Sequence, residues 1–139
     1  MKKIIALLLL VASLFALTSC FGLATGPMSL GKKLDDIYGD DASIYIFLSH
    51  EDIKYFFEDL EISDNGVYAI MEIDTYGDAY GDEEGYIFYC ENSSQAKKIE
   101  NEFIDYIKDN DLDDEGFTVS RTHTAVFIGS EAILRKIKS

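Results

Sequence analysis

Residues 86–107 read YIFYCENSSQAKKIENEFIDYI, and within them a strand pattern changes into a helix pattern. Residues 86–91 start with aromatic and β-branched side chains, which is typical of a strand. Asn92 or Ser93 can then cap a helix through its side-chain oxygen. Behind the cap, apolar residues recur at helical spacing on one side of the helix: Ala96, Ile99, Phe103 and Ile107. The stretch therefore predicts a strand followed by a helix with one apolar face.

The residues before this unit predict two helices and two strands. A short helix capped by Ser29 comes first, and residues 43–48 read as a strand. Ser49 can cap the next helix, and residues 67–73 alternate as a second strand. The apolar face of this second helix is made of Ile53, Phe56, Phe57 and Leu60.

The residues after the unit predict two strands, 117–121 and 124–128, and a short helix capped by Ser130. From residue 43 the order is therefore β-α-β-β-α-β, with an extra C-terminal strand and helix. This is the ferredoxin-like order of an α+β fold, an antiparallel sheet with helices packed on one face. A sheet with a different strand order fits the same periodicity and remains the alternative.

The chain begins MKKIIALLLLVASLFALTSC, with two lysines ahead of an apolar run over residues 4–17. A membrane-spanning helix needs ~20 apolar residues, so this shorter run is typical of a secretory signal. The ending at residues 17–20, Leu-Thr-Ser-Cys, resembles the lipobox of bacterial lipoproteins. An ordinary cleaved signal or an uncleaved N-terminal anchor is the alternative.

The lipobox resemblance implies a diacylglyceryl group on the Cys20 thiol and cleavage of the peptide bond before it. It divides the chain into a signal peptide over 1–19, a lipidated tether over 20–28 and a single α+β domain over 29–139. Two acyl chains anchor a protein stably without a segment in the bilayer. The expected location is thus the cell membrane, with the protein on the extracytoplasmic side and the membrane as its partner.

Removal of residues 1–19 leaves 120 residues, enough for one domain, and takes away two lysines but no acid. The net charge changes from −14 to −16, which argues against binding to nucleic acid. Residues 84–107 and 124–133 also loosely resemble small lipoproteins of unknown function from Gram-positive bacteria. That resemblance implies no activity.

Two acidic segments are candidates for a calcium site, because clustered carboxylates supply the oxygen ligands that calcium prefers. The EF-hand pattern, however, would place Asp114 where glycine is needed and Ser120 where glutamate is needed. Solvated acidic turns are therefore favoured, and a calcium-responsive surface domain is the alternative function. The carboxylates concerned are Asp74, Asp78 and Asp82 in one segment and Asp109, Asp111 and Asp113 in the other.

The remaining reactive side chains do not combine into a catalytic or metal site. Cys90 is expected to act as a small hydrophobe within a strand. His50 and His123 are the only histidines and are expected at the surface. No Gly-x-Ser-x-Gly motif occurs, and too few nitrogen and sulfur ligands exist for zinc. We therefore expect a non-enzymatic binding or accessory module without a cofactor.

The alternation of the strands predicts an uncovered sheet face rich in tyrosine and aliphatic side chains. Such a face could bind a cell-envelope protein or a second copy of the chain, unless one of the domain's own helices covers it. The residues assigned to this face are Tyr45, Phe47, Tyr68, Ile70, Ile87 and Tyr89.

Overall fold

A computed structural model describes residues 25–60 and 66–139 of the chain. The expected signal peptide and the expected lipidation site at Cys20 fall outside these residues. No helix of the described part is long and apolar enough to cross a membrane. The elements are, in chain order, α3 (Pro27–Tyr38), η1 (Gly39–Asp41), β1 (Ala42–Phe47), α4 (His50–Leu60), β2 (Val67–Thr75), β3 (Glu83–Cys90), α5 (Ser93–Asp109), β4 (Phe117–Thr122), β5 (Ala125–Ser130) and α6 (Glu131–Lys138).

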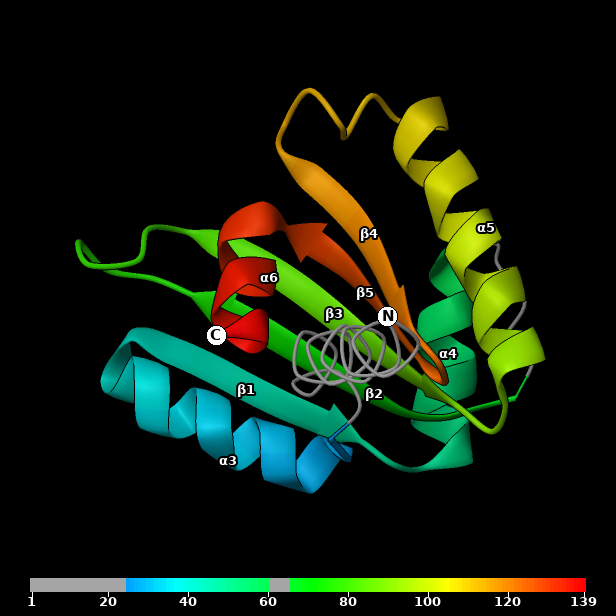
Figure 1. Ribbon diagram of the computed structural model, residues 1–139, viewed down its shortest axis with the longest axis horizontal. Helices are drawn as coiled ribbons and strands as arrows, with labels where there is room; N and C mark the ends of the chain where they lie inside the picture. The colour runs from blue at the N-terminus through cyan, green and yellow to red at the C-terminus, as the bar shows by residue number, and fades with distance from the viewer. Residues whose placement is uncertain (1–24, 61–65) are drawn as a thin grey trace, which may run out of the picture.

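The five strands form one antiparallel sheet in the order β1-β2-β3-β5-β4 (Figure 1). The α+β class is confirmed, but the ferredoxin-like strand order is not found. Helix α4 joins two antiparallel neighbours, β1 and β2, so no parallel crossover forms there. The two residues between β4 and β5 hold these strands together as a hairpin, and β5 pairs with β3 on its other side.

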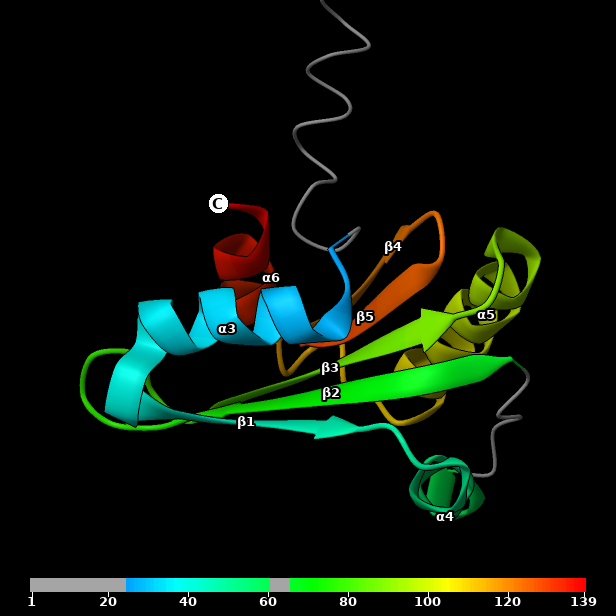
Figure 2. The same ribbon diagram turned by 90° about the horizontal axis from the view of Figure 1, so that it is seen from below.

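Helices cover both faces of the sheet, so the prediction of helices on one face is wrong. Figure 2 shows α3 and α6 on one side and α4 on the other. The cause lies in the central strands, where consecutive residues are apolar and fully buried, as at Ile70-Met71, Ile87-Phe88 and Val126-Phe127. Successive strand residues point to opposite faces, so each of these pairs needs a cover on both sides.

The two faces carry separate hydrophobic cores. Under α3 and α6, the helix residues Leu30, Leu34 and Ile137 pack on strand residues that include Met71 and Phe127. The core on the other face contains the strand side chains that alternate with those of the first core. There the helix residues Ile53, Phe57, Ile99 and Phe103 pack on the strand residues Ile70, Phe88, Val126 and Ile128.

Three predicted helix starts are confirmed by hydrogen bonds. The Ser49 hydroxyl accepts from the Asp52 amide at 3.1 Å, and the Ser130 hydroxyl accepts from the Ala132 amide at 3.1 Å. Of the two residues that could cap α5, Asn92 is the one that does, accepting from the Gln95 amide at 3.0 Å. The first helix differs, because α3 begins at Pro27, within the expected tether. Proline fits this first position because its missing N–H has no helical partner there.

The second core leaves part of its sheet face without a helix. In the described part of the chain, α4 and α5 lie over one end of this face, and the end near the β2–β3 loop has no helix over it (Figure 2). Register places Tyr45, Glu72 and Tyr86 side by side on this open area. A groove lies where the covered and open parts of the face meet.

Candidate functional site: an aromatic groove with an acidic rim

The groove has a volume of about 690 Å³ and is lined by residues of six elements and one loop. Eight of its fourteen lining residues are aromatic, and three are carboxylates. Its floor consists of Tyr86 and Phe88 of β3 and Ile128 of the neighbouring strand β5. Because Tyr86 and Phe88 are two residues apart in a strand, both rings face the groove.

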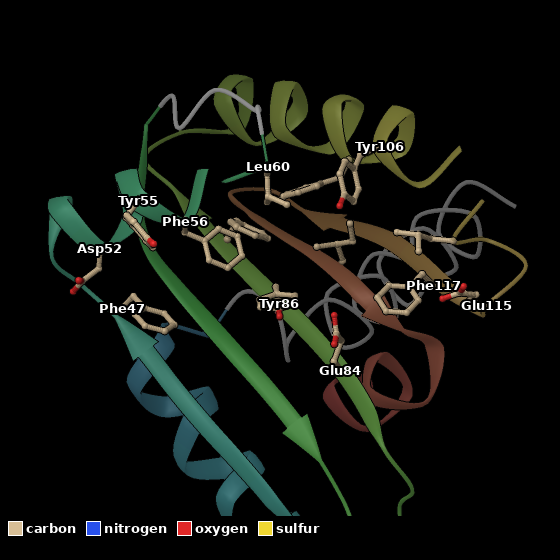
Figure 3. A pocket seen from close by; sticks show the side chains of 14 residues that line it. Phe47, Asp52, Tyr55, Phe56, Leu60, Glu84, Tyr86, Tyr106, Glu115 and Phe117 are labelled. Atoms are coloured by element: carbon tan, nitrogen blue, oxygen red, sulfur yellow. The ribbon is translucent and has the colours of Figure 1, made fainter. Parts of the chain in front are cut away.

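One wall is formed by α4, which contributes Tyr55, Phe56 and Leu60 to the lining (Figure 3). The Phe56 ring centroid lies 5.4 Å from that of Tyr86 and 5.7 Å from that of Phe88. These separations are typical of favourable aromatic pairs. The α4 wall is therefore packed directly onto the floor.

The opposite wall is formed by Phe103 and Tyr106 of α5, together with Leu112 and Phe117 beyond its end. The Phe103 ring centroid lies 4.6 Å from that of Phe88. Hydrogen bonds hold the chain between α5 and β4 against this wall. The Leu112 amide donates to the Ile107 carbonyl at 3.0 Å, and the Phe117 amide donates to the Leu112 carbonyl at 3.1 Å.

The charged side chains of the lining are Asp52, Glu84 and Glu115, and among the described lining residues none is basic. In Figure 3 Glu84 stands beside Tyr86, Glu115 lies near Phe117, and Asp52 points away from the groove. The Asp52 carboxylate also accepts a hydrogen bond from the Ser49 hydroxyl at 2.6 Å. Glu84 and Glu115 are thus the carboxylates available to a ligand.

The acidic character continues onto the open sheet area beside Glu84. Burial raises the pKa of Glu84, and the Asp74 carboxylate, its register partner, raises it further. Burial likewise raises the pKa of Glu72, with a smaller contribution from Asp74, whereas a hydrogen bond from the Tyr86 hydroxyl lowers it. Burial and the same carboxylates raise the pKa of Tyr86 itself. Negative charge is therefore concentrated on this side of the groove.

This concentration of carboxylates does not form a metal site. Within residues 25–60 and 66–139, no three His, Cys, Asp or Glu side chains are grouped so as to hold a metal ion. Of the calcium candidates, Asp74 is half-buried in β2, and Asp78 and Asp82 are exposed in the β2–β3 loop. The candidates of the other segment, at the end of α5 and in the loop after it, are exposed as well. Nothing in this arrangement favours the calcium-responsive alternative.

The six residues predicted to share an open face do not share one. Ile70, Ile87 and Tyr89 are buried, with 0%, 0% and 3% of their surface exposed. Ile70 belongs to the core under α4 and α5, whereas Ile87 and Tyr89 belong to the core under α3 and α6. The expected contact surface is wrong in these three positions, because helices cover both faces.

Of the other three residues of that set, Tyr45 and Phe47 share one sheet face, and Tyr68 does not lie on it. Phe47 is half-buried and lines the groove, so it is the one member that the structure brings to the candidate site. Tyr45 is exposed on the same sheet face, beyond the groove. A register shift between Val67 and Ala69 turns Tyr68 away from that face, and its ring lies 6.3 Å from the Tyr89 ring.

The cysteine and the histidines lie where the sequence predicted. Cys90 is 2% exposed within the core under α4 and α5, and burial raises the pKa of its thiol to about 11. The thiol is therefore protonated at neutral pH and a poor nucleophile. His50 and His123 are both exposed, and neither lines the groove.

Sequence reasoning missed most of the groove. Helical spacing places Phe56 and Leu60 on an apolar helix face, but it does not indicate a ligand site. Tyr86 and Glu84 carried a usable signal, because they alternate with Phe88 and so must share a face. No local signal existed for Tyr106, Leu112, Glu115 and Phe117, which meet the floor only through tertiary packing.

Comparisons with protein-family models, with curated proteins and with solved structures find no match to this chain. The groove itself is therefore the basis for assigning a function.

Proposed function

We propose that this protein is a lipid-anchored, non-enzymatic binding module on the extracytoplasmic side of the cell membrane, and that it binds its ligand in the aromatic groove. The observation that carries the binding role is the groove's lining of partly exposed aromatic rings. A volume of about 690 Å³ falls within the range of small-molecule sites. Apolar walls with a few polar groups are also typical of such sites.

The arrangement of the groove supports binding more than catalysis. Both histidines and the cysteine lie outside the lining, so the groove does not present the imidazole or thiol on which many small hydrolases depend. The lining carboxylates stand beside rings and aliphatic side chains, where they can hold a ligand in place. The anchor part of the proposal is supported by the basic start, the apolar run and the Leu-Thr-Ser-Cys ending.

The anchor is tested on the peptide spanning residues 20–32, which trypsin would release from the processed chain. We expect this peptide from the wild-type protein to carry the mass of a diacylglyceryl group. Cys20→Ala should remove that mass, and the matched variant Cys90→Ala should keep it, because only the N-terminal cysteine is proposed to be modified. An unmodified wild-type peptide would refute the lipid anchor and leave the groove's role untouched.

The groove is tested by the thermal stability of the membrane-anchored full-length chain against a panel of small molecules. A compound that binds the native state raises the melting temperature. We expect compounds with apolar bodies to do so, and Tyr55→Ala and Tyr106→Ala to abolish their effect. Tyr45→Ala is the matched control, because Tyr45 is 55% exposed and lies outside the lining. Stabilisation that survives both groove variants would refute the groove as the ligand site.

A further inference from the structure

We infer that the groove binds a small organic cation, a molecule with an apolar body and one positively charged nitrogen. In this arrangement the aromatic rings pack against the apolar body, and Glu84 and Glu115 hold the charge. The inference rests on the proposed binding role of the groove and specifies the chemical class of its ligand.

The charge of the site is the first argument. Asp52, Glu84 and Glu115 are the charged side chains of the lining, and the described lining includes no lysine, arginine or histidine to neutralise them. Register places Glu72 and Asp74 beside Glu84 on the open sheet area. A ligand with a negative charge would be repelled by these groups and by the net charge of −14 of the chain. A ligand with a positive charge therefore fits this site better than a ligand with a negative charge.

The rings are the second argument. A positive nitrogen is attracted to the face of an aromatic ring, and this attraction grows when water is excluded. Tyr86 and Tyr106 are both partly exposed, rise from the floor and from the α5 wall, and lie in the lining with the two available carboxylates (Figure 3). The site thus combines the two kinds of group, ring faces and carboxylates, that favour an organic ammonium ion.

The third argument separates an organic cation from a metal ion. In the described residues, no three acidic, histidine or cysteine side chains are grouped closely enough to coordinate a metal. A bare ion would also leave the apolar walls, such as Phe56, Leu112 and Phe117, without contacts. A ligand that carries its charge on an apolar body uses both parts of the lining. The volume of about 690 Å³ suits one such molecule.

The test uses photo-crosslinking on membranes that carry the full-length chain. The cationic photoprobe is (4-benzoylbenzyl)trimethylammonium, and the neutral one is 4-(hydroxymethyl)benzophenone. Mass spectrometry locates the adducts along the chain. We expect the cationic probe to label lining residues such as Tyr106 or Leu112, with a yield that falls as the salt concentration rises.

Competition then measures how much the positive charge of a ligand contributes to its affinity for the groove. Phenethyltrimethylammonium, 3-phenyl-1-propanol and 3-phenylpropionate have similar bodies and are cationic, neutral and anionic. We expect the ammonium compound to block groove labelling at about one-tenth of the concentration that the alcohol requires. The carboxylate should not compete. Glu84→Gln and Glu115→Gln should each reduce the advantage of the ammonium compound, and the exposed control Asp78→Asn should leave it unchanged.

The outcomes separate this inference from the function on which it rests. Equal labelling by both probes, with equal competition by the ammonium compound and the alcohol, would overturn the cationic ligand and leave a binding groove. Adducts that avoid the groove with both probes would refute the binding role itself. A third outcome is that the peptide acetyl-Phe-Arg-amide blocks groove labelling while the ammonium compound does not. That result would indicate a protein partner instead of a small molecule and would overturn the inference.

Discussion

At the scale of single residues, the pairing of Gly85 with Gly129 decides how closely β3 and β5 approach each other. A Cβ at Gly129 would collide with backbone atoms of Glu84 and Gly85, which cannot move as a flexible side chain could. Gly129 also has a φ of +149°, which other residues rarely adopt. The sheet beneath α6 therefore depends on the missing side chain of this residue.

We expect Gly129→Ala to lower the free energy of unfolding by about 2 kcal/mol or more, because it adds a backbone collision to an unfavourable φ. Urea denaturation followed by circular dichroism measures the change. The matched control is Gly81→Ala, at a φ of +74° with open space around its Cβ. Gly81→Ala should lower the free energy of unfolding by about 1 kcal/mol, the cost of the unfavourable φ without a collision. Equal losses in the two variants would contradict the collision.

At the scale of elements, an ion pair holds α5 against the edge strand β4. The Arg121 Nε donates to a Glu100 carboxylate oxygen at 2.7 Å, and the two side chains are 29% and 25% exposed. Charge-assisted hydrogen bonds that are shielded from water are stronger than exposed ion pairs. This contact fixes the helix that supplies the α5 wall of the groove.

Glu100→Gln should therefore lower the free energy of unfolding by about 1–2 kcal/mol, because it removes the charge from a shielded hydrogen bond. The matched control is Glu58→Gln, which breaks the exposed Lys54–Glu58 pair at 3.6 Å within α4. That change should cost less than about 0.5 kcal/mol. Chemical denaturation of both variants in low salt provides the comparison, and a control loss as large as that of Glu100→Gln would argue against the α5–β4 contact.

At the scale of the whole molecule, the carboxyl groups of Glu72 and Glu84 make the stability of the fold depend on pH. The folded state holds Glu72 and Glu84 with pKa values above the ordinary 4.5, chiefly through burial. A carboxyl with a raised pKa destabilises the folded state when it is ionised. The folded state binds protons more readily than the unfolded state in this range, so stability increases as pH falls through the folded pKa values toward 4.5.

We expect the free energy of unfolding to rise as the pH is lowered from about 7 to about 5, and part of this slope to vanish in the double variant Glu72→Gln/Glu84→Gln. The double variant should also be more stable than the wild type at neutral pH. Urea denaturation at several pH values measures both effects. The control Asp78→Asn/Asp82→Asn removes the same charge from exposed positions. If this control flattens the pH dependence of the free energy of unfolding equally, the effect comes from net charge alone.

The sequence by itself determined the features that depend on neighbouring residues. Caps at Ser49 and Ser130 were predictable, because a side-chain oxygen bonds an amide two or three residues away. The buried face of α5, from Ala96 to Ile107, followed from helical spacing alone. The acidity of the chain and the signal pattern around Cys20 are likewise local properties.

Only the tertiary structure decided the strand order, the use of both sheet faces and the groove. The pairing of β5 with β3 joins Ile128 to Tyr86 across more than one intervening element, and no local pattern specifies that partner. Periodicity showed that Ile70 and Met71 point to opposite faces, but not that both faces would be covered. The groove exists because Phe56, Tyr86 and Tyr106 come from α4, β3 and α5, and only the burial of the core under α4 and α5 brings these elements together.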